Sequence, residues 1–179
     1  MTSATPPTRP STAPPDWPHC GHGATAEDSV GCRGSRILDR TACLAHAPEP
    51  DRAAYLAALA PGADIDHRGT PFTAELLDWL LDALRDPTAG RPRLGTARFD
   101  WAVFSGGAGF ERAIFSGDAT GFEGAAFSGD AWFDGVTFSG DAGFDGVTFS
   151  GDSGFEGAAF PAAPGSKERP SPATPGSAG

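Results

Sequence analysis

Residues 122–160 read FEGAAFSGDAWFDGVTFSGDAGFDGVTFSGDSGFEGAAF, and this stretch decides the fold. Phenylalanine recurs in it after five and six residues alternately, which gives an 11-residue unit. The same spacing continues upstream with one interval of seven, so that twelve of the 13 phenylalanines form one series: Phe99, Phe104, Phe110, Phe115, Phe122, Phe127, Phe133, Phe138, Phe144, Phe149, Phe155 and Phe160. A repeat of fixed period sets the architecture of the chain that contains it.

The residues beside each phenylalanine predict a chain that winds into stacked coils. A small or β-branched residue precedes every one of the twelve by two positions, and in extended backbone such a pair points to the same side. Glycine follows by two positions in nine of the twelve repeats and permits a tight corner. We therefore expect a β-solenoid with phenylalanine stacked inside it. An ordinary antiparallel sheet is the alternative, but it would leave strands of only two or three residues between glycines.

The small-x-Phe-x-Gly pattern of residues 96–160 resembles the pentapeptide-repeat proteins, whose unit is A-[D/N]-[L/F]-x-x. The resemblance implies a mainly β fold, a right-handed quadrilateral β-helix with one repeat on each face. The alternation of five and six departs from the family's unit. We expect the added residues to bulge at the corners; they are Gly107, Asp130, Asp141, Asp152 and two residues near Asp118 and Ala119.

The rest of the chain divides into four segments by composition. Residues 1–17 and 161–179 are rich in proline and small polar residues and are predicted to be disordered tails. Residues 18–48 hold all three cysteines and three of the four histidines. Residues 49–95 are predicted to form a small helical cap on the solenoid of residues 96–160.

Within this cap the sequence predicts two helices and an early rung of the solenoid. The first helix covers residues 49–61 with Asp51 as its N-cap, and the second covers about 74–85 with Thr73 as its N-cap and a leucine face. Ala63-Asp64-Ile65 and Thr70-Pro71-Phe72 have the small-x-apolar form of the repeat, which places a rung near 63–72. We expect the leucine face to cover the N-terminal end of the phenylalanine stack.

The cysteines and histidines of residues 18–48 have the spacing of a small zinc site. Three cysteines cannot all pair as disulfides, and the chain begins without the apolar segment of a secretion signal. Tetrahedral zinc needs four nitrogen or sulfur donors, which Cys20, Cys32, Cys43 and His46 supply, with His22 or, less favourably, His19 as a substitute. A segment with so few large apolar residues depends on a metal to fold. Reduced thiols in a loose segment, and a redox or catalytic role, remain as alternatives.

Charge narrows the classes of function. The net charge is −10, and residues 99–160 contain ten acidic residues against one basic residue, Arg112. This excess argues against direct binding of nucleic acid or of an anionic membrane, and no apolar stretch is long enough to span one. No phosphate-binding loop, nucleophile motif or metalloprotease motif is present. The sequence thus predicts a non-enzymatic, cytoplasmic bacterial protein.

The predicted function is that of a scaffold that offers a rigid acidic surface to a protein partner. The candidate partner surface consists of Asp118, Asp130, Trp132, Asp134, Asp141, Asp145 and Asp152. A second interpretation is that the acids only keep an exposed β-surface soluble. The resemblance implies an alternative function, a DNA mimic that inhibits or protects a type II topoisomerase. Because no cap is evident after Phe160, the C-terminal end is predicted to dimerise or to be shielded by the tail.

Overall fold

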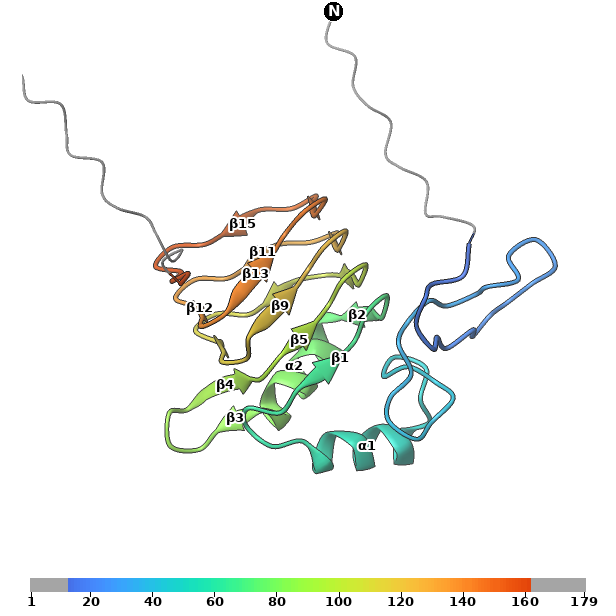
Figure 1. Ribbon diagram of the computed structural model, residues 1–179, viewed down its shortest axis with the longest axis horizontal. Coiled ribbons are helices and arrows are strands. Elements are labelled where there is room, and N and C mark those ends of the chain that lie inside the picture. The colour runs from blue at the N-terminus through green and yellow to red at the C-terminus, as the bar shows by residue number, and fades with distance from the viewer. Residues whose placement is uncertain (1–12, 162–179) are drawn as a thin grey trace, which may run out of the picture.

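The computed structural model describes residues 13–161, and most of them form one solenoid whose base is covered by helices and by an N-terminal segment (Figure 1). Residues 1–12 and 162–179, which make up most of the two predicted tails, lie outside the described residues. Residues 13–17 of the predicted N-terminal tail are among the described residues, and the indole N–H of Trp17 donates a hydrogen bond to the Arg33 carbonyl over 2.9 Å.

The strands form four sheets, one on each face of a quadrilateral coil, and we name each face after its strand in the second coil. The β5 face contains β1 (Ile65–Asp66), β5 (Ala97–Arg98), β9 (Ala119–Gly121) and β13 (Asp141–Gly143). The β6 face contains β2 (Pro71–Thr73), β6 (Val103–Ser105), β10 (Ala126–Phe127) and β14 (Thr148–Phe149). The β7 face contains β7 (Ala108–Gly109), β11 (Ala131–Trp132) and β15 (Ser153–Gly154). The β8 face contains β3 (Arg85–Asp86), β4 (Arg91–Leu94), β8 (Ile114–Phe115) and β12 (Thr137–Phe138).

All pairs between coils are parallel, and only the short pair of β3 with β4 is antiparallel among the named strands. The chain passes through the β5, β6, β7 and β8 faces in turn, so the β5 and β7 faces lie opposite each other. The predicted β-solenoid with one repeat on each face is confirmed.

The core of the solenoid consists of four columns of aromatic rings. Phe72, Phe104, Phe127 and Phe149 stack with centroids 4.5–5.2 Å apart. The other three columns follow the same rule and are Phe99–Phe122–Phe144, Phe110–Phe133–Phe155 and Phe115–Phe138–Phe160. The predicted core list is too long at its end. Phe144 and Phe149 are half-buried, and Phe155 and Phe160 are 37% and 52% exposed, because no coil of the described residues covers the last one.

The first coil continues the columns with residues other than phenylalanine. The predicted rung at Thr70-Pro71-Phe72 is confirmed, since Phe72 pairs with Phe104. The register predicted for Ala63-Asp64-Ile65 is wrong by two residues, because Ile65 pairs with Ala97 and therefore holds the small-residue position. His67 then stands below Phe99 in the position of a ring, and its centroid lies 6.3 Å from that of Phe99. Side chains two residues apart point to the same side of a strand, so the pattern alone could not separate the two registers.

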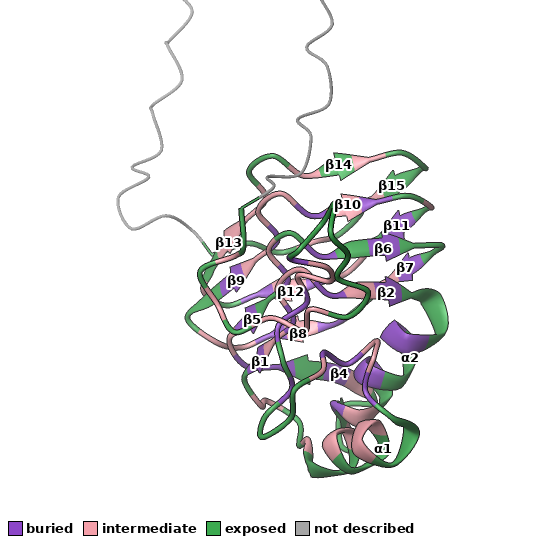
Figure 2. Cartoon of the chain, turned by 90° about the vertical axis from the view of Figure 1, so that its right-hand side faces the viewer, coloured by how far each residue is buried: buried purple, intermediate pink, exposed green. Residues whose placement is uncertain are grey.

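Helix α2 (Ala74–Ala83) takes the place of a β7-face strand in the first coil, and Figure 2 shows it below β7. Its predicted cap is confirmed, since the Thr73 hydroxyl accepts the Leu76 amide at 3.2 Å. Its buried leucines join the solenoid core; they are Leu76, Leu77, Leu80 and Leu81. Helix α1 (Glu49–Ala58) begins two residues before the predicted cap Asp51, with Pro48 at its N-cap, and ends three residues before residue 61.

Candidate metal centre and acidic faces

Three short backbone segments build the candidate metal centre. The chain around Cys20 runs antiparallel to the chain around Cys32, with the Cys20 amide donating to the Gly34 carbonyl and the Cys32 amide to the His22 carbonyl, at 2.8 and 2.9 Å. A turn brings Cys43 and His46 together, and the His46 amide donates to the Cys43 carbonyl at 3.1 Å. Segments that are remote in sequence thus present four donor side chains to one point.

The four donor atoms have the separations of a tetrahedral site. Nδ1 of His46 lies 3.6 Å from Sγ of Cys20 and 3.5 Å from Sγ of Cys43. Sγ of Cys32 lies 3.9 Å from Sγ of Cys43, and all four donor atoms lie within 4.8 Å of one another. Zinc–ligand bonds of about 2.3 Å to sulfur and 2.0–2.1 Å to nitrogen give tetrahedral edges of about 3.8 Å between sulfurs and 3.6 Å from sulfur to nitrogen. The residues therefore fit one metal ion.

His22 does not belong to this group of four. Its ring stacks on that of His46, with centroids 4.2 Å apart and planes 19° apart. His19, the less favoured substitute, lies in an isolated antiparallel bridge with Ser35. His22 is therefore a neighbour that orients the His46 ring, and the four donors are those that the spacing put first.

The neighbouring thiols of Cys32 and Cys43 shift each other's pKa in opposite directions. The hydrogen bond from the Cys43 thiol, helped by the Gly34 amide and by His46, outweighs burial and lowers the pKa of Cys32 to about 5. The pKa of Cys43 is raised, because its thiol is the donor in that hydrogen bond and is buried. A thiolate is the form that binds a metal, so the arrangement supplies one such ligand near neutral pH.

Gly34 lets the centre pack against the first coil of the solenoid. A Cβ atom on Gly34 would lie 2.8 Å from Cβ of Cys43, closer than real Cβ contacts, and 3.2 Å from Cα of Thr70, which is tighter than most of them. The Ser35 amide donates to the Arg68 carbonyl at 2.7 Å, which extends this contact along the chain. The sequence does not mark Gly34 as a packing position. The only signal for it is the place of Gly34 between two cysteines.

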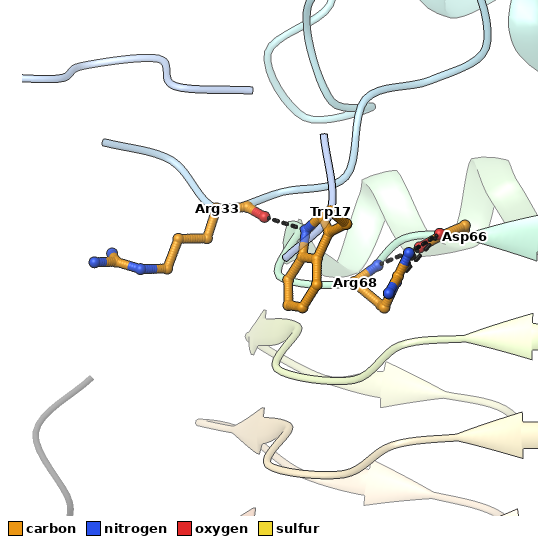
Figure 3. Close-up of polar contacts among 4 residues, drawn as sticks. All are labelled: Trp17, Arg33, Asp66 and Arg68. Carbon is orange, nitrogen blue, oxygen red and sulfur yellow. Dashed lines mark hydrogen bonds and ion pairs between the residues drawn. The ribbon is translucent and has the colours of Figure 1, made fainter. Parts of the chain in front are cut away.

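Trp17 and Arg68 fasten the N-terminal segment to β1 (Figure 3). The Arg68 guanidinium lies 4.7 Å from the centroid of the Trp17 ring and also binds the Asp66 carboxylate, with a shortest distance of 2.6 Å. Burial alone would raise the pKa of Asp66, but the hydrogen bonds from Arg68 outweigh it and hold that pKa below its usual value. The candidate metal centre is thus joined to the solenoid by an arginine that an aromatic ring covers.

His67 carries a second contact between the cap and the core. It is fully buried, and its Nε2 lies 3.1 Å from the hydroxyl of Tyr55 in α1. Burial lowers the pKa of His67 to about 4 and raises that of Tyr55 to about 12. The imidazole at the foot of the Phe99 column is therefore neutral at physiological pH.

The acidic residues gather on two opposite faces. The residue after each phenylalanine is acidic on the β5 and β7 faces, namely Asp100, Glu123 and Asp145 on one and Glu111, Asp134 and Glu156 on the other. At the same position the β6 and β8 faces carry serine, namely Ser105, Ser128, Ser150, Ser116 and Ser139. The 11-residue unit is half a coil, so its alternation of Phe-Ser and Phe-acid assigns the acids to alternate faces.

The candidate partner surface is therefore two surfaces. Asp118, Asp141 and Asp145 lie on or beside the β5 face. Trp132 lies on the β7 face, with Asp130, Asp134 and Asp152 beside it. Asp141 is also the first residue of β13, paired with Ala119, and is not the corner bulge that was predicted. The repeat length held the signal for this division, but the sequence analysis read the acids as one surface.

On the β5 face the carboxyl groups of Asp100 and Glu123 lie close together beside Gly121. The Glu123 amide donates to Oδ1 of Asp100 at 3.2 Å. Burial and the neighbouring Glu123 raise the pKa of Asp100 to about 6, while the hydrogen bond from Asp100 lowers the pKa of Glu123. Gly121 and Gly143 leave a shallow hollow of about 290 Å³ beside this pair.

Comparison with known families identifies the class of the solenoid. Residues 122–163 match the family model described as "Pentapeptide repeats (9 copies)". The Phe-centred solenoid is thus a pentapeptide-repeat β-helix, as the resemblance implied. Comparisons with curated proteins and with solved structures find no significant match. Within residues 13–161, neither helix has the length and apolar character that crossing a membrane requires.

Proposed function

We propose that this protein is a non-enzymatic scaffold that binds a protein partner through the acidic faces of its solenoid. The observation that carries the proposal is the restriction of the carboxylates to two opposite faces of a rigid core. Acids that served only for solubility would have no reason to alternate with serine from face to face, as they do directly after Phe99 to Phe155. Among the described residues, no ion pair involves a carboxylate of residues 99–160, so these charges are available to a partner.

Affinity capture with variants matched by face tests the scaffold proposal. The full chain is compared with Asp134→Asn/Asp152→Asn on the β7 face and with Asp118→Asn/Asp145→Asn on the β5 face. Ser128→Asn/Thr148→Asn on the neutral β6 face is the control. A specific partner is retained by the control and lost with at least one acidic pair. Partners that all variants retain equally would contradict the proposal.

The metal that best suits the Cys20, Cys32, Cys43 and His46 donors is zinc in a structural role. Three thiolates and one imidazole in a closed tetrahedron are typical of structural zinc, and zinc-binding thiols persist in a reducing compartment such as the cytoplasm. Metal analysis of protein purified without chelator is expected to find about one zinc per chain, and less than half in Cys43→Ser. Zinc content that Cys43→Ser leaves unchanged would place the ion elsewhere.

DNA mimicry is the second candidate, and the observation that favours it is the pair of opposite acidic faces. The length counts against it, since four coils at about 4.8 Å each span roughly 19 Å, or about six base pairs. Addition of the purified protein to a gyrase supercoiling reaction separates the two functions. Inhibition or drug protection at micromolar concentration would favour mimicry, and no effect favours the scaffold.

A homodimer through the C-terminal end of the solenoid would make a longer solenoid. The exposed rings of Phe155 and Phe160 and the free edges of the last coil support it within the described residues. Light scattering after size exclusion is expected to give twice the chain mass for the native protein and the monomer mass for Phe160→Asp. A native monomer at 100 μM would contradict the dimer.

A further inference from the structure

The β7 face differs from the other three faces in having a tryptophan at its centre. Trp132 holds the outward position of β11, and the register pairs it with Gly109 in the coil before and Gly154 in the coil after. A Cβ atom on Gly154 would lie 2.6 Å from Cε3 of Trp132, so the indole lies across the bare backbone of that glycine. The side chain is nevertheless exposed. The indole of Trp132 therefore packs against glycine backbone and has one side open to solvent.

Carboxylates flank this ring on both sides. Asp130 and Asp152 precede the strands, and Asp134 and Glu156 follow the inward phenylalanines. Two of them are fixed by main-chain hydrogen bonds: the Asp152 amide donates to Oδ1 of Asp130 at 3.0 Å, and the Glu156 amide to Oδ1 of Asp134 at 2.7 Å. Within residues 99–160 the one basic residue is Arg112, at the corner after β7, and it takes part in no ion pair with a described residue.

The opposite β5 face has no such arrangement. Its strand position next to Asp66 is held by Arg98, and Arg68 binds the same carboxylate, so part of its charge is balanced within the chain. Its tryptophan, Trp101, lies at a corner after the strand, against Gly124 of the next coil, rather than in the strand. The β7 face alone joins a central exposed aromatic ring to carboxylates that no described cation neutralises.

We infer that the β7 face binds an arginine of the partner, with the guanidinium stacked on Trp132 and hydrogen-bonded to the carboxylate of Asp130 or Asp134. This inference rests on the proposed scaffold function and names the chemistry of the partner. A guanidinium is planar, stacks on indole and bonds carboxylates through a fork of N–H groups, which the compact ammonium of lysine cannot do at once. Residues two apart on a strand are about 6.6 Å apart, within reach of a guanidinium that lies on the ring.

Titration of the full-length protein with two synthetic peptides tests the inference. One peptide contains three arginines separated by glycine and serine, and the other has lysine in their place. Calorimetry and tryptophan fluorescence are expected to show tighter binding of the arginine peptide. Trp132→Thr introduces the residue that precedes phenylalanine in β12 and β14. It is expected to weaken arginine binding about threefold to fivefold and lysine binding less than twofold. Trp132→Phe is expected to retain most of the arginine affinity.

The matched control is Trp101→Gly, which installs the residue that Gly124 and Gly146 provide at the same corner in later coils. It is expected to bind the arginine peptide as the native protein does. The inference is overturned if Trp132→Thr is folded and binds with native affinity, or if Trp101→Gly loses as much. If Trp132→Thr does not fold, native affinity for the arginine peptide no greater than for the lysine peptide overturns it.

The two proposals fail separately. If arginine binding does not depend on Trp132 but a captured partner is still lost with Asp134→Asn/Asp152→Asn, the scaffold stands and the arginine contact is wrong. If the partner is indifferent to all face variants while the peptide still discriminates at Trp132, the surface binds arginine but is not the scaffold's partner site.

Discussion

The N-terminal segment of residues 13–48 and the solenoid of residues 97–160 are held together by different means. The solenoid repeats one inward ring in four columns, so each coil is supported by the next. The N-terminal segment buries few large side chains, and four donor atoms within 4.8 Å of one another occupy its centre. Stability in the solenoid is therefore distributed over many equal contacts, whereas stability in the N-terminal segment depends on a few atoms.

Removal of one metal ligand is expected to have the largest effect. Structural zinc contributes about 10–16 kcal/mol of apparent binding free energy at pH 7, and Cys43→Ser removes a buried ligand from the centre. We expect residues 18–47 to lose their protection from proteolysis while the solenoid stays folded. Limited proteolysis with mass spectrometry measures this, and Ser29→Ala on the exposed turn is the control. Equal protection in Cys43→Ser would contradict a metal-dependent segment.

Two phenylalanine truncations sharpen the account of the solenoid. Phe110→Ala removes a fully buried ring from the middle of a column and is expected to cost about 3–5 kcal/mol in the free energy of unfolding. Phe160→Ala removes a ring that is 52% exposed at the open end and is expected to cost less than half as much. Denaturant unfolding followed by circular dichroism gives both values. Equal losses would mean that the last coil is covered.

The pH dependence of stability tests His67, which joins the cap to the core. The pKa is about 4 in the folded protein against 6.5 unfolded, so between these values the unfolded imidazole gains a proton that the folded one does not. Stability therefore falls as the pH is lowered from 6.5 to 4, by about 3 kcal/mol from this residue. Denaturation at several pH values is expected to show a shallower decline of the free energy of unfolding in His67→Leu than in the native protein. Leucine is chosen because Leu94 occupies the equivalent position below Phe115. Parallel declines would show that His67 is not the cause.

Gly34 offers the smallest expected change. Gly34→Ala places a Cβ atom 2.8 Å from that of Cys43, and overpacking of this kind costs about 1–3 kcal/mol. We expect the variant to hold zinc less tightly, so that zinc is released at a lower concentration of chelator in a titration with a chromophoric chelator. Gly107→Ala, where nothing lies within 4 Å, is the control. Release at the native chelator concentration would show that the centre tolerates the methyl group.

The sequence predicted the features that follow from the phenylalanine repeat and from the cysteine spacing. It did not predict the positions where another residue type takes the place of phenylalanine. The twelve-membered phenylalanine series predicted the columns, and Thr73 predicted the start of α2. His67 and Leu94 also occupy ring positions, but neither is phenylalanine, so Ala63-Asp64-Ile65 was placed in the wrong register and Leu94 was not assigned to a column. Helix α1 starts at the predicted residue 49, but its N-cap is Pro48 and not Asp51, because Pro50 suits the first turn of a helix as well as Asp51 suits a cap.

The candidate metal centre was predictable as a set of ligands but not as a place. The spacing of Cys20, Cys32, Cys43 and His46 indicated four donors for one ion. Nothing in the spacing showed that Gly34 lies against Thr70 or that Trp17 lies on Arg68. These are contacts between segments more than 30 residues apart, and no periodicity records them.

Hydrogen exchange of the full-length protein before and after chelation tests the comparison most directly. Before chelation, we expect the same sample to contain about one zinc per chain. Chelation is then predicted to raise exchange sharply in residues 18–47, while amides of residues 99–138 exchange as slowly as before. Unchanged exchange in residues 18–47 after complete zinc removal would contradict the claim that these two regions are stabilised by different means.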